Sequence, residues 1–161
     1  MTQFFAQSPD QVLPQSELLK ISGLDFMQGI LDGKIAGPPI CRLMNFHLAS
    51  VAKGEVVFEG APEFAASNPI GSIHGGWYGT VLDSCMACAV MTTVPQGSFY
   101  TTLEYKVNIT RAIPVGMAMR ATGRIQHGGR RTGVADGALR GLDDGKLYAT
   151  GTTTCLIMKG V

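Results

Sequence analysis

Apolar and polar residues alternate between residues 102 and 110 of the chain. The apolar residues take every second position, which is the period of a β-strand that buries one face. We therefore expect a strand here that packs on the core through one side. The apolar positions are Leu103, Tyr105, Val107 and Ile109.

Five further segments are predicted to be strands. Residues 41–51 and 55–60 flank a turn at 52–54, and three more strand patterns follow in the second half of the chain. The run from Asp143 to Lys146, with Gly145, predicts a hairpin between the last two. Consecutive strands with short connections favour an antiparallel sheet. The three later segments are 117–126, 131–142 and 146–158.

A different pattern covers residues 75–94, where one charged residue, Asp83, lies in a long apolar stretch. The charge falls near the middle and no Lys or Arg flanks either end, so we expect a buried helix and not a membrane span. The sheet would cover one side of this helix and another element the opposite side.

Residues 1–36 predict short helices that form a leader segment, one of them capped by Ser22, and Pro38-Pro39 ends this part. The leader and a main domain of residues 37–161 would make up a single domain overall. These patterns together predict an α+β fold, with an antiparallel sheet wrapped around one long central helix and a helical leader in front.

Composition narrows the functional classes. Of the 161 residues 45% are hydrophobic and 16% are charged, with a formal net charge of +1. No basic patch suggests a nucleic-acid partner, and the apolar composition favours surface buried between subunits. The N-terminus has no basic leader and no apolar signal segment, so we expect a cytoplasmic protein with cysteines as thiols, and no membrane partner.

The stretch Ile-His-Gly-Gly at 73–76 opens the apolar helix, and Asp83 follows His74 by nine residues. The first N–H groups of a helix are unpaired, and glycines let a carbonyl oxygen approach them closely. The glycines could equally serve tight packing. A carboxylate in an apolar helix is costly unless it is paired, hydrogen-bonded or used in catalysis. Asp83 therefore forms an ion pair at an interface, accepts a hydrogen bond from Asn68, Ser84 or a threonine, or is a catalytic residue.

The segments NPIGSIHGGWYGTVLD, TTLEYKVNITRA and GRRTGVADGALRGLDDGKLYATGTTT resemble the PaaI-like (phenylacetate-degradation type) acyl-coenzyme A thioesterases of the hotdog fold. The resemblance runs from roughly Pro38 to Met158. It implies a curved antiparallel sheet around a central helix, a homodimer at least and a homotetramer by preference. It also implies an acyl-coenzyme A substrate, with no metal and no separate cofactor.

The resemblance assigns roles to individual residues. The N–H of Gly75 would bind the oxyanion, and Asp83 would act as general base on water or as a nucleophile. Asn68 and His74 would orient these groups, with a histidine base as the rival interpretation for His74. A hydroxyl that positions water matches Thr101 or Thr102.

Gly75 and Asp83 lie eight residues apart, about 12 Å along one helix at 1.5 Å per residue. One thioester carbon cannot contact both groups of one chain. A two-fold dimer with antiparallel neighbouring helices would bring Gly75 of one subunit close to Asp83 of the other.

His-Gly-Gly recurs at 127–129, where it lies between two strand patterns and predicts a hairpin bend. The resemblance implies that the residues after it bind the phosphates of coenzyme A, and solvated arginines are the alternative. Arg111 is a weaker candidate for carrier binding. Members of that family have a basic residue before a proline at this place, whereas alanine follows Arg111. The spacing of Cys85 and Cys88 suits a metal site or a redox pair, but core packing is the interpretation that their apolar helix favours. The predicted carrier-binding residues are Gly129, Arg130, Arg131, Thr132 and Arg111.

The sequence therefore predicts a thioester hydrolase that converts acyl-coenzyme A to the free acid and coenzyme A. Two alternatives stay open: a non-catalytic acyl-coenzyme A binding domain, and a hotdog hydratase. The acid nine residues after His74 argues against the hydratase, and turnover separates the other two.

Overall fold

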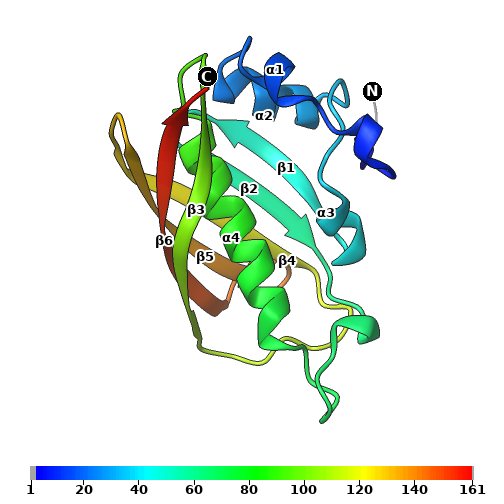
Figure 1. The fold of residues 1–161 in the computed structure, drawn as a ribbon. Helices are drawn as coiled ribbons and strands as arrows, with labels where there is room; N and C mark the ends of the chain where they lie inside the picture. The colour runs from blue at the N-terminus through cyan, green and yellow to red at the C-terminus, as the bar shows by residue number, and fades with distance from the viewer. Residues whose placement is uncertain (1–2, 161) are drawn as a thin grey trace.

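A computed structural model describes residues 3–160 of the chain. One six-stranded antiparallel sheet, in the order β1-β2-β4-β5-β6-β3, curves around the helix α4 (Figure 1). The predicted α+β architecture is therefore confirmed. The helix is α4 (Gly75–Met91), and the strands are β1 (Phe46–Ala52), β2 (Glu55–Gly60), β3 (Ser98–Ile109), β4 (Met119–Gly128), β5 (Thr132–Gly141) and β6 (Leu147–Lys159).

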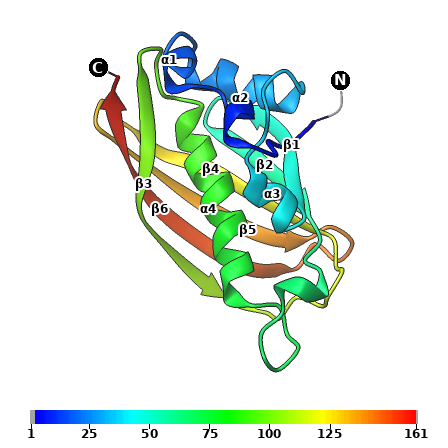
Figure 2. The same ribbon diagram turned by 45° about the vertical axis from the view of Figure 1, so that its right-hand side comes forward.

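The leader helices lie over β1 and the C-terminal end of α4 and leave the N-terminal part of α4 uncovered (Figure 2). The main leader helix α2 (Gly23–Leu31) packs against β1 and α4, and the side chain of Ser22 caps it by accepting from the N–H of Asp25 at 3.1 Å. None of the helices in the described residues is long and apolar enough to cross a membrane. The remaining short helices are η1 (Pro9–Gln11), α1 (Gln15–Leu18), α3 (Pro39–Leu43) and η2 (Phe64–Ala66).

The expected strand at 41–51 was wrong at its start, because Pro39–Leu43 forms the helix α3 and β1 begins only at Phe46. Proline fixes φ near the helical value and lacks an N–H, so the pair Pro38-Pro39 starts a helix without losing a hydrogen bond. Asn45, with φ of 53°, then turns the chain into β1.

A row of glycines lets α4 lie close to the sheet. Gly123, Gly137 and Gly151 are direct partners across β4, β5 and β6. A Cβ atom at Gly137 would lie 2.7 Å from Cγ of Met86 on α4, and one at Gly123 would overlap the backbone of Cys85. Larger residues in this row would push the helix off the sheet.

β3 does not bury the face that its alternation predicts. Leu103, Tyr105 and Ile109 are 57%, 48% and 49% exposed, so the expectation of a half-buried strand was wrong for the single chain. β3 is an edge strand paired only with β6, and a bulge at Leu103 shifts its register between Thr102 and Glu104. An edge strand with exposed apolar side chains presents unpaired backbone groups and apolar surface to which another chain can bind.

Candidate active site

His74 starts α4 as its N-cap residue. Its backbone is extended, with φ of −65° and ψ of 141°, and its ring Nδ1 accepts from the N–H of Gly76 at 2.8 Å. A neutral imidazole that accepts at Nδ1 carries its proton on Nε2. The backbone N–H of His74 donates to the carbonyl of Ala66 at 2.9 Å, which ties the helix start to the preceding loop. His74 therefore holds the glycines in place.

The N–H of Gly75 is the one left without a protein acceptor at this helix start, among the residues that the structure describes. The N–H groups of Gly76 and Trp77 both donate to His74, to its ring and to its carbonyl oxygen. Gly75 is exposed, and a Cβ there would meet only Cδ1 of Ile109, at 3.5 Å. An unpaired, accessible N–H at the positive end of a helix can donate to a carbonyl oxygen or an anion.

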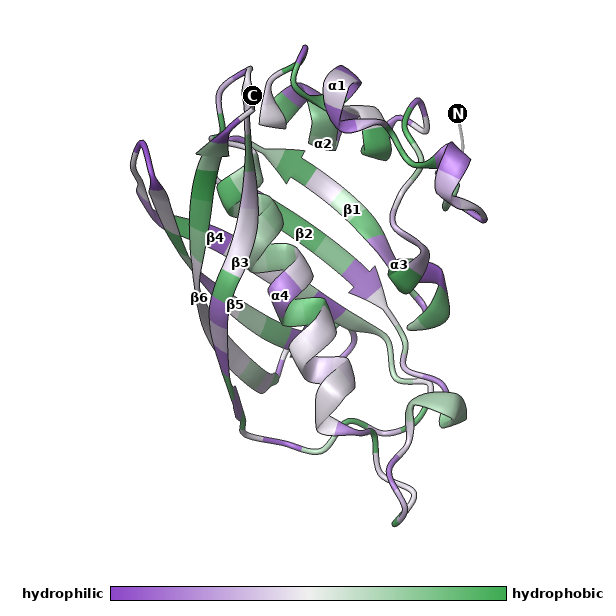
Figure 3. Cartoon of the chain, in the orientation of Figure 1, coloured by the Kyte–Doolittle hydropathy of each residue, from purple (hydrophilic) through white to green (hydrophobic). Residues whose placement is uncertain are grey.

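Asp83 lies midway along α4. Figure 3 shows that α4 is mostly neutral or hydrophobic in colour, with a hydrophilic segment in its middle part. The hydroxyl of Thr102 donates to Oδ1 of Asp83 at 3.1 Å. Burial raises the pKa of this carboxyl above its ordinary value, and the hydrogen bond from Thr102 opposes part of that effect. Within residues 3–160 no Lys, Arg or His forms a salt bridge with it. A structural ion pair is therefore not what Asp83 provides in the single chain.

Thr102 is the threonine that contacts Asp83, whereas Thr101 is exposed on β3. The sequence left these two neighbours open because their register was uncertain. Successive strand residues point to opposite faces, so only one of them can face α4. The pairing of Thr102 with Cys155 of β6, just before the bulge, sets which one it is.

Gly75, Gly79 and Asp83 recur every four residues and so lie on one side of α4. The far half of β3 runs beside this side. The hydroxyl oxygen of Tyr105 lies 3.1 Å from the position a Cβ would take at Gly79, and Ile109 approaches Gly75. Tyr105 was not among the predicted site residues, because its position in the alternation marked it as core.

Asn68 lies in the loop before α4 and is locked by its own side chain. Its Oδ1 accepts from the N–H groups of Ile70 and Ser72, both at 3.1 Å. Its Nδ2 donates to no group of the described residues and is free to bind water or substrate. The adjacent Ser67, which the sequence did not single out, has a buried hydroxyl oxygen without a hydrogen-bond partner among residues 3–160.

The second His-Gly-Gly forms the hairpin between β4 and β5, as predicted. The N–H of Gly129 donates to the carbonyl of Thr132 at 2.8 Å, and Arg130 and Arg131 are exposed at the tip. A Cβ at Gly128 would lie 3.5 Å from the hydroxyl of Thr93, just beyond the end of α4. The hairpin is therefore at the opposite end of α4 from Gly75 (Figure 1).

Arg111 lies at the Gly75 end instead. The hydroxyl of Tyr78 on α4 donates to its carbonyl oxygen at 3.2 Å, and its guanidinium carbon is 5.8 Å from the ring centre of Tyr148. One chain thus separates the candidate basic residues into two groups. Arg111 is close to the helix start, and Arg130 and Arg131 lie beyond its end.

The single chain also separates the two candidate catalytic groups. Gly75 and Asp83 belong to one continuous helix, so about 12 Å of helix rise lies between them. Their shared side of α4 borders the exposed apolar residues of β3. A site that contains both kinds of group would need a second surface, which covers this side of α4 and brings a donor close to Asp83 or a carboxylate close to Gly75.

Comparison with known proteins shows which family the chain resembles. The model of the Thioesterase superfamily matches residues 70–148, which contain the helix start, Asp83 and the hairpin. Over this segment, slightly less than half of the chain, and in its hotdog-like fold, the chain is similar to the Thioesterase superfamily. No curated protein matches the chain.

Solved structures share the fold. A phenylacetic acid degradation-related protein of Ralstonia eutropha superposes with a TM-score of 0.74 and 28% identity, over 81% of this chain and 98% of that one. The PaaI protein of the Escherichia coli phenylacetic acid degradation operon gives 0.68 and 21%, over 76% and 86%. A hypothetical thioesterase of Streptococcus pneumoniae with coenzyme A gives 0.64 and 23%, over 71% and 87%. The predicted resemblance to PaaI-like proteins is confirmed.

Proposed function

We propose that the protein is an acyl-coenzyme A thioesterase. The observation that carries this proposal is the pair of groups on one side of α4, the unpaired N–H of Gly75 and the half-buried carboxylate of Asp83. A donor and a carboxylate are what thioester hydrolysis requires, since the thiol leaves readily with a pKa of about 8.5. The match of residues 70–148 to the Thioesterase superfamily supports the assignment.

The active unit in this proposal is a homodimer. Two copies of α4, antiparallel about a two-fold axis, would bring Gly75 of one protomer close to Asp83 of its partner and would cover the exposed apolar residues of β3. Because the axis reverses the helix, the hairpin with Arg130 and Arg131 at the far end of one α4 would approach the Gly75 end of the other. Each dimer would hold two sites.

The chemistry follows from these positions. The N–H of Gly75 donates to the thioester carbonyl oxygen and stabilises the negative charge that develops there. The carboxylate of Asp83 takes a proton from water as the water oxygen attacks the carbonyl carbon, and the C–S bond breaks to release the coenzyme A thiolate. Alternatively Asp83 attacks first, and water then hydrolyses the mixed anhydride. Both routes need Asp83 ionised.

Coenzyme A is the carrier that the surface favours. The guanidinium groups of Arg130 and Arg131 are exposed and suited to phosphate oxygens. The same fold accompanies coenzyme A in the Streptococcus pneumoniae structure, and the Ralstonia eutropha relative is related to phenylacetic acid degradation. Arg111 would add a positive charge near the helix start.

Thiol release from a panel of alkyl- and aryl-acyl-coenzyme A esters tests the proposal, with the wild type compared with Asp83→Asn. We expect kcat to fall by a factor of about 10² to 10⁴ in the variant, because the base or nucleophile is lost. Coenzyme A binding and the circular dichroism spectrum should stay unchanged, which separates lost chemistry from lost folding.

Other outcomes would identify a different function. If no ester releases thiol while coenzyme A esters still raise the melting temperature, the chain is a binding domain. If an enoyl ester changes absorbance without releasing thiol, the chain is a hydratase. Full activity in Asp83→Asn would reject the mechanism and direct attention to His74.

A further inference from the structure

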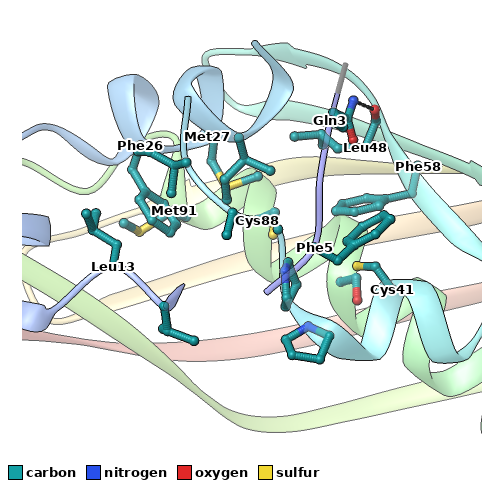
Figure 4. A pocket seen from close by; sticks show the side chains of 18 of the residues that line it. Gln3, Phe5, Leu13, Phe26, Met27, Cys41, Leu48, Phe58, Cys88 and Met91 are labelled. Carbon is teal, nitrogen blue, oxygen red and sulfur yellow. Dashed lines mark hydrogen bonds between the residues drawn. The ribbon is translucent and has the colours of Figure 1, made fainter. Parts of the chain in front are cut away.

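A cavity of about 350 Å³ lies between the leader and α4 (Figure 4). The leader contributes one wall, with apolar residues that include Phe26, Met27 and Ile30, and the opposite wall includes Cys88 and Met91 of α4. No charged residue lines it among the residues that the structure describes. The occupant that such a wall selects is uncharged and apolar.

The cavity lies beside the carboxylate of Asp83. Ser84, Cys88 and Met91 line it and recur along one side of α4, about 100° around the helix from Asp83. On β3, Tyr100 lines the cavity, while Thr102, two residues further on the same face, contacts Asp83. On both α4 and β3, residues close to Asp83 and its partner Thr102 therefore line the cavity.

The pKa of Tyr100 reflects its burial beside these groups. Burial raises the pKa of its hydroxyl well above the ordinary value, and charges on Cys88, Cys155 and Asp83 raise it further. Tyr100 is half-buried, as expected for a side chain that lines the cavity. Its hydroxyl, like the side chains of Gln3 and Ser84, is a polar group in a largely apolar wall.

The volume limits the size of the occupant. A methylene group has about the volume of a water molecule, roughly 30 Å³. The cavity therefore accommodates an apolar group on the order of ten carbon atoms. Its volume is at the lower end of the range of about 300–1,000 Å³ that small-molecule pockets span.

We propose that this cavity binds the acyl group of the thioester, as an uncharged alkyl or aryl chain of medium length, and that the leader helix α2 sets the chain length that fits. The inference rests on the proposed thioesterase function and adds its substrate class. The leader lies outside the matched family segment 70–148, so this wall belongs to the part of the chain that the family match leaves unassigned.

Two leader substitutions change the cavity in opposite directions. Phe26→Ala enlarges it, and Ala36→Phe fills it, because both side chains line the space. Gln28→Ala is the matched control, since Gln28 is exposed on the same helix and lies outside the cavity wall. Circular dichroism and melting curves would establish that all three variants fold.

The readout is kcat/KM for alkyl esters of increasing length and for phenylacetyl-coenzyme A. We expect the ratio of long-chain to short-chain kcat/KM to rise about tenfold in Phe26→Ala, to fall about tenfold in Ala36→Phe, and to stay unchanged in Gln28→Ala. Preference for the alkyl or the aryl series would distinguish the two kinds of acyl group. An unchanged length profile in both folded cavity variants would overturn the cavity assignment and leave the thioesterase function standing.

Binding tests the cavity without turnover. Decanoic acid and phenylacetic acid are the probes, and the melting temperature of the wild type, of Asp83→Asn and of Ala36→Phe is the measurement. Stabilisation by either acid that Ala36→Phe abolishes and Asp83→Asn retains supports the cavity even if no ester is hydrolysed. Equal stabilisation of all three proteins, or of none, contradicts it.

Discussion

The two His-Gly-Gly tripeptides, at 74–76 and 127–129, have the same sequence and different structures. In the first, the histidine ring caps a helix and leaves the N–H of Gly75 unpaired within the described residues. In the second, the N–H of Gly129 closes a hairpin on Thr132. The residues that follow decide the outcome: an apolar run continues as a helix, whereas Arg-Arg-Thr leads into a strand. The tripeptide itself therefore has no fixed function.

Proline at one glycine of each tripeptide should separate the two tripeptides most strongly. Gly75→Pro removes only the proposed oxyanion donor, because proline is favoured at the first helical position and the extended backbone of His74 tolerates it. We expect kcat/KM to fall by about 10²–10³, measured by thiol release. Gly129→Pro should instead lower the melting temperature, because it removes the hairpin hydrogen bond.

Gly75→Ala is the matched control for this experiment. It retains the N–H, and its Cβ has room beside Ile109. Near wild-type activity in Gly75→Ala together with the loss in Gly75→Pro would assign the effect to the donor. Equal losses in both variants would point to packing at the helix start.

The arginines after the second tripeptide should affect carrier binding and leave the chemical step intact. In Arg130→Ala/Arg131→Ala we expect KM for acyl-coenzyme A to rise about tenfold with kcat unchanged, because charge-assisted hydrogen bonds to phosphate are lost. The wild-type KM should rise with salt, and the variant should lose most of this dependence. Arg42→Ala removes an exposed charge elsewhere, and a rise in KM as large as that of the double variant would contradict specific binding.

The pH profile should sharpen the role of Asp83, which follows only the first tripeptide. Activity needs the ionised carboxylate and is lost as pH falls through its pKa; burial raises that pKa, so the acidic limb of kcat/KM should lie above the usual aspartate value of about 3.9. Thr102→Val removes the hydrogen bond that opposes this rise and should shift the limb to higher pH. The neighbouring Thr101→Val should leave the limb in place, and an equal shift there would reject the assignment.

The histidines should differ least. His74→Ala removes the N-cap interaction with Gly76 and should cost about 1 kcal/mol of unfolding free energy. His127→Ala, at an exposed strand end, should change it little. Denaturant unfolding of both variants measures the difference. A larger loss in His127→Ala would show that the hairpin, and not the helix start, depends on its histidine.

Much of the fold was predictable from local patterns. The long helix, the hairpin with Gly145 and the Ser22 cap follow from periodicity and from the conformations that glycine and serine favour. The error at 41–45 came from an apolar run too short to distinguish strand from helix, where Pro39 decided for the helix. The domain division at residues 36 and 37 stays a prediction, and its end points at residues 1 and 161 lie outside the described residues.

The candidate site was predictable in its residues and not in its arrangement. Asp83 and Gly75 stood out because a charge and a glycine pair are unusual in an apolar helix. The choice of Thr102 over Thr101 depended on strand register, and the exposed face of β3 depended on its place at the sheet edge. Neither property is encoded locally, since register and strand order come from pairings between distant segments.

The sequence by itself determined the long helix, most of each strand, and the positions of Asp83 and of the Gly75 N–H on that helix, because each depends on neighbouring residues. Tertiary structure alone decided which side of α4 meets the sheet, through the row Gly123, Gly137 and Gly151 that distant strands align. It also decided that the leader encloses a cavity beside Asp83. Both outcomes come from close packing between segments far apart in the chain, which no local pattern can specify.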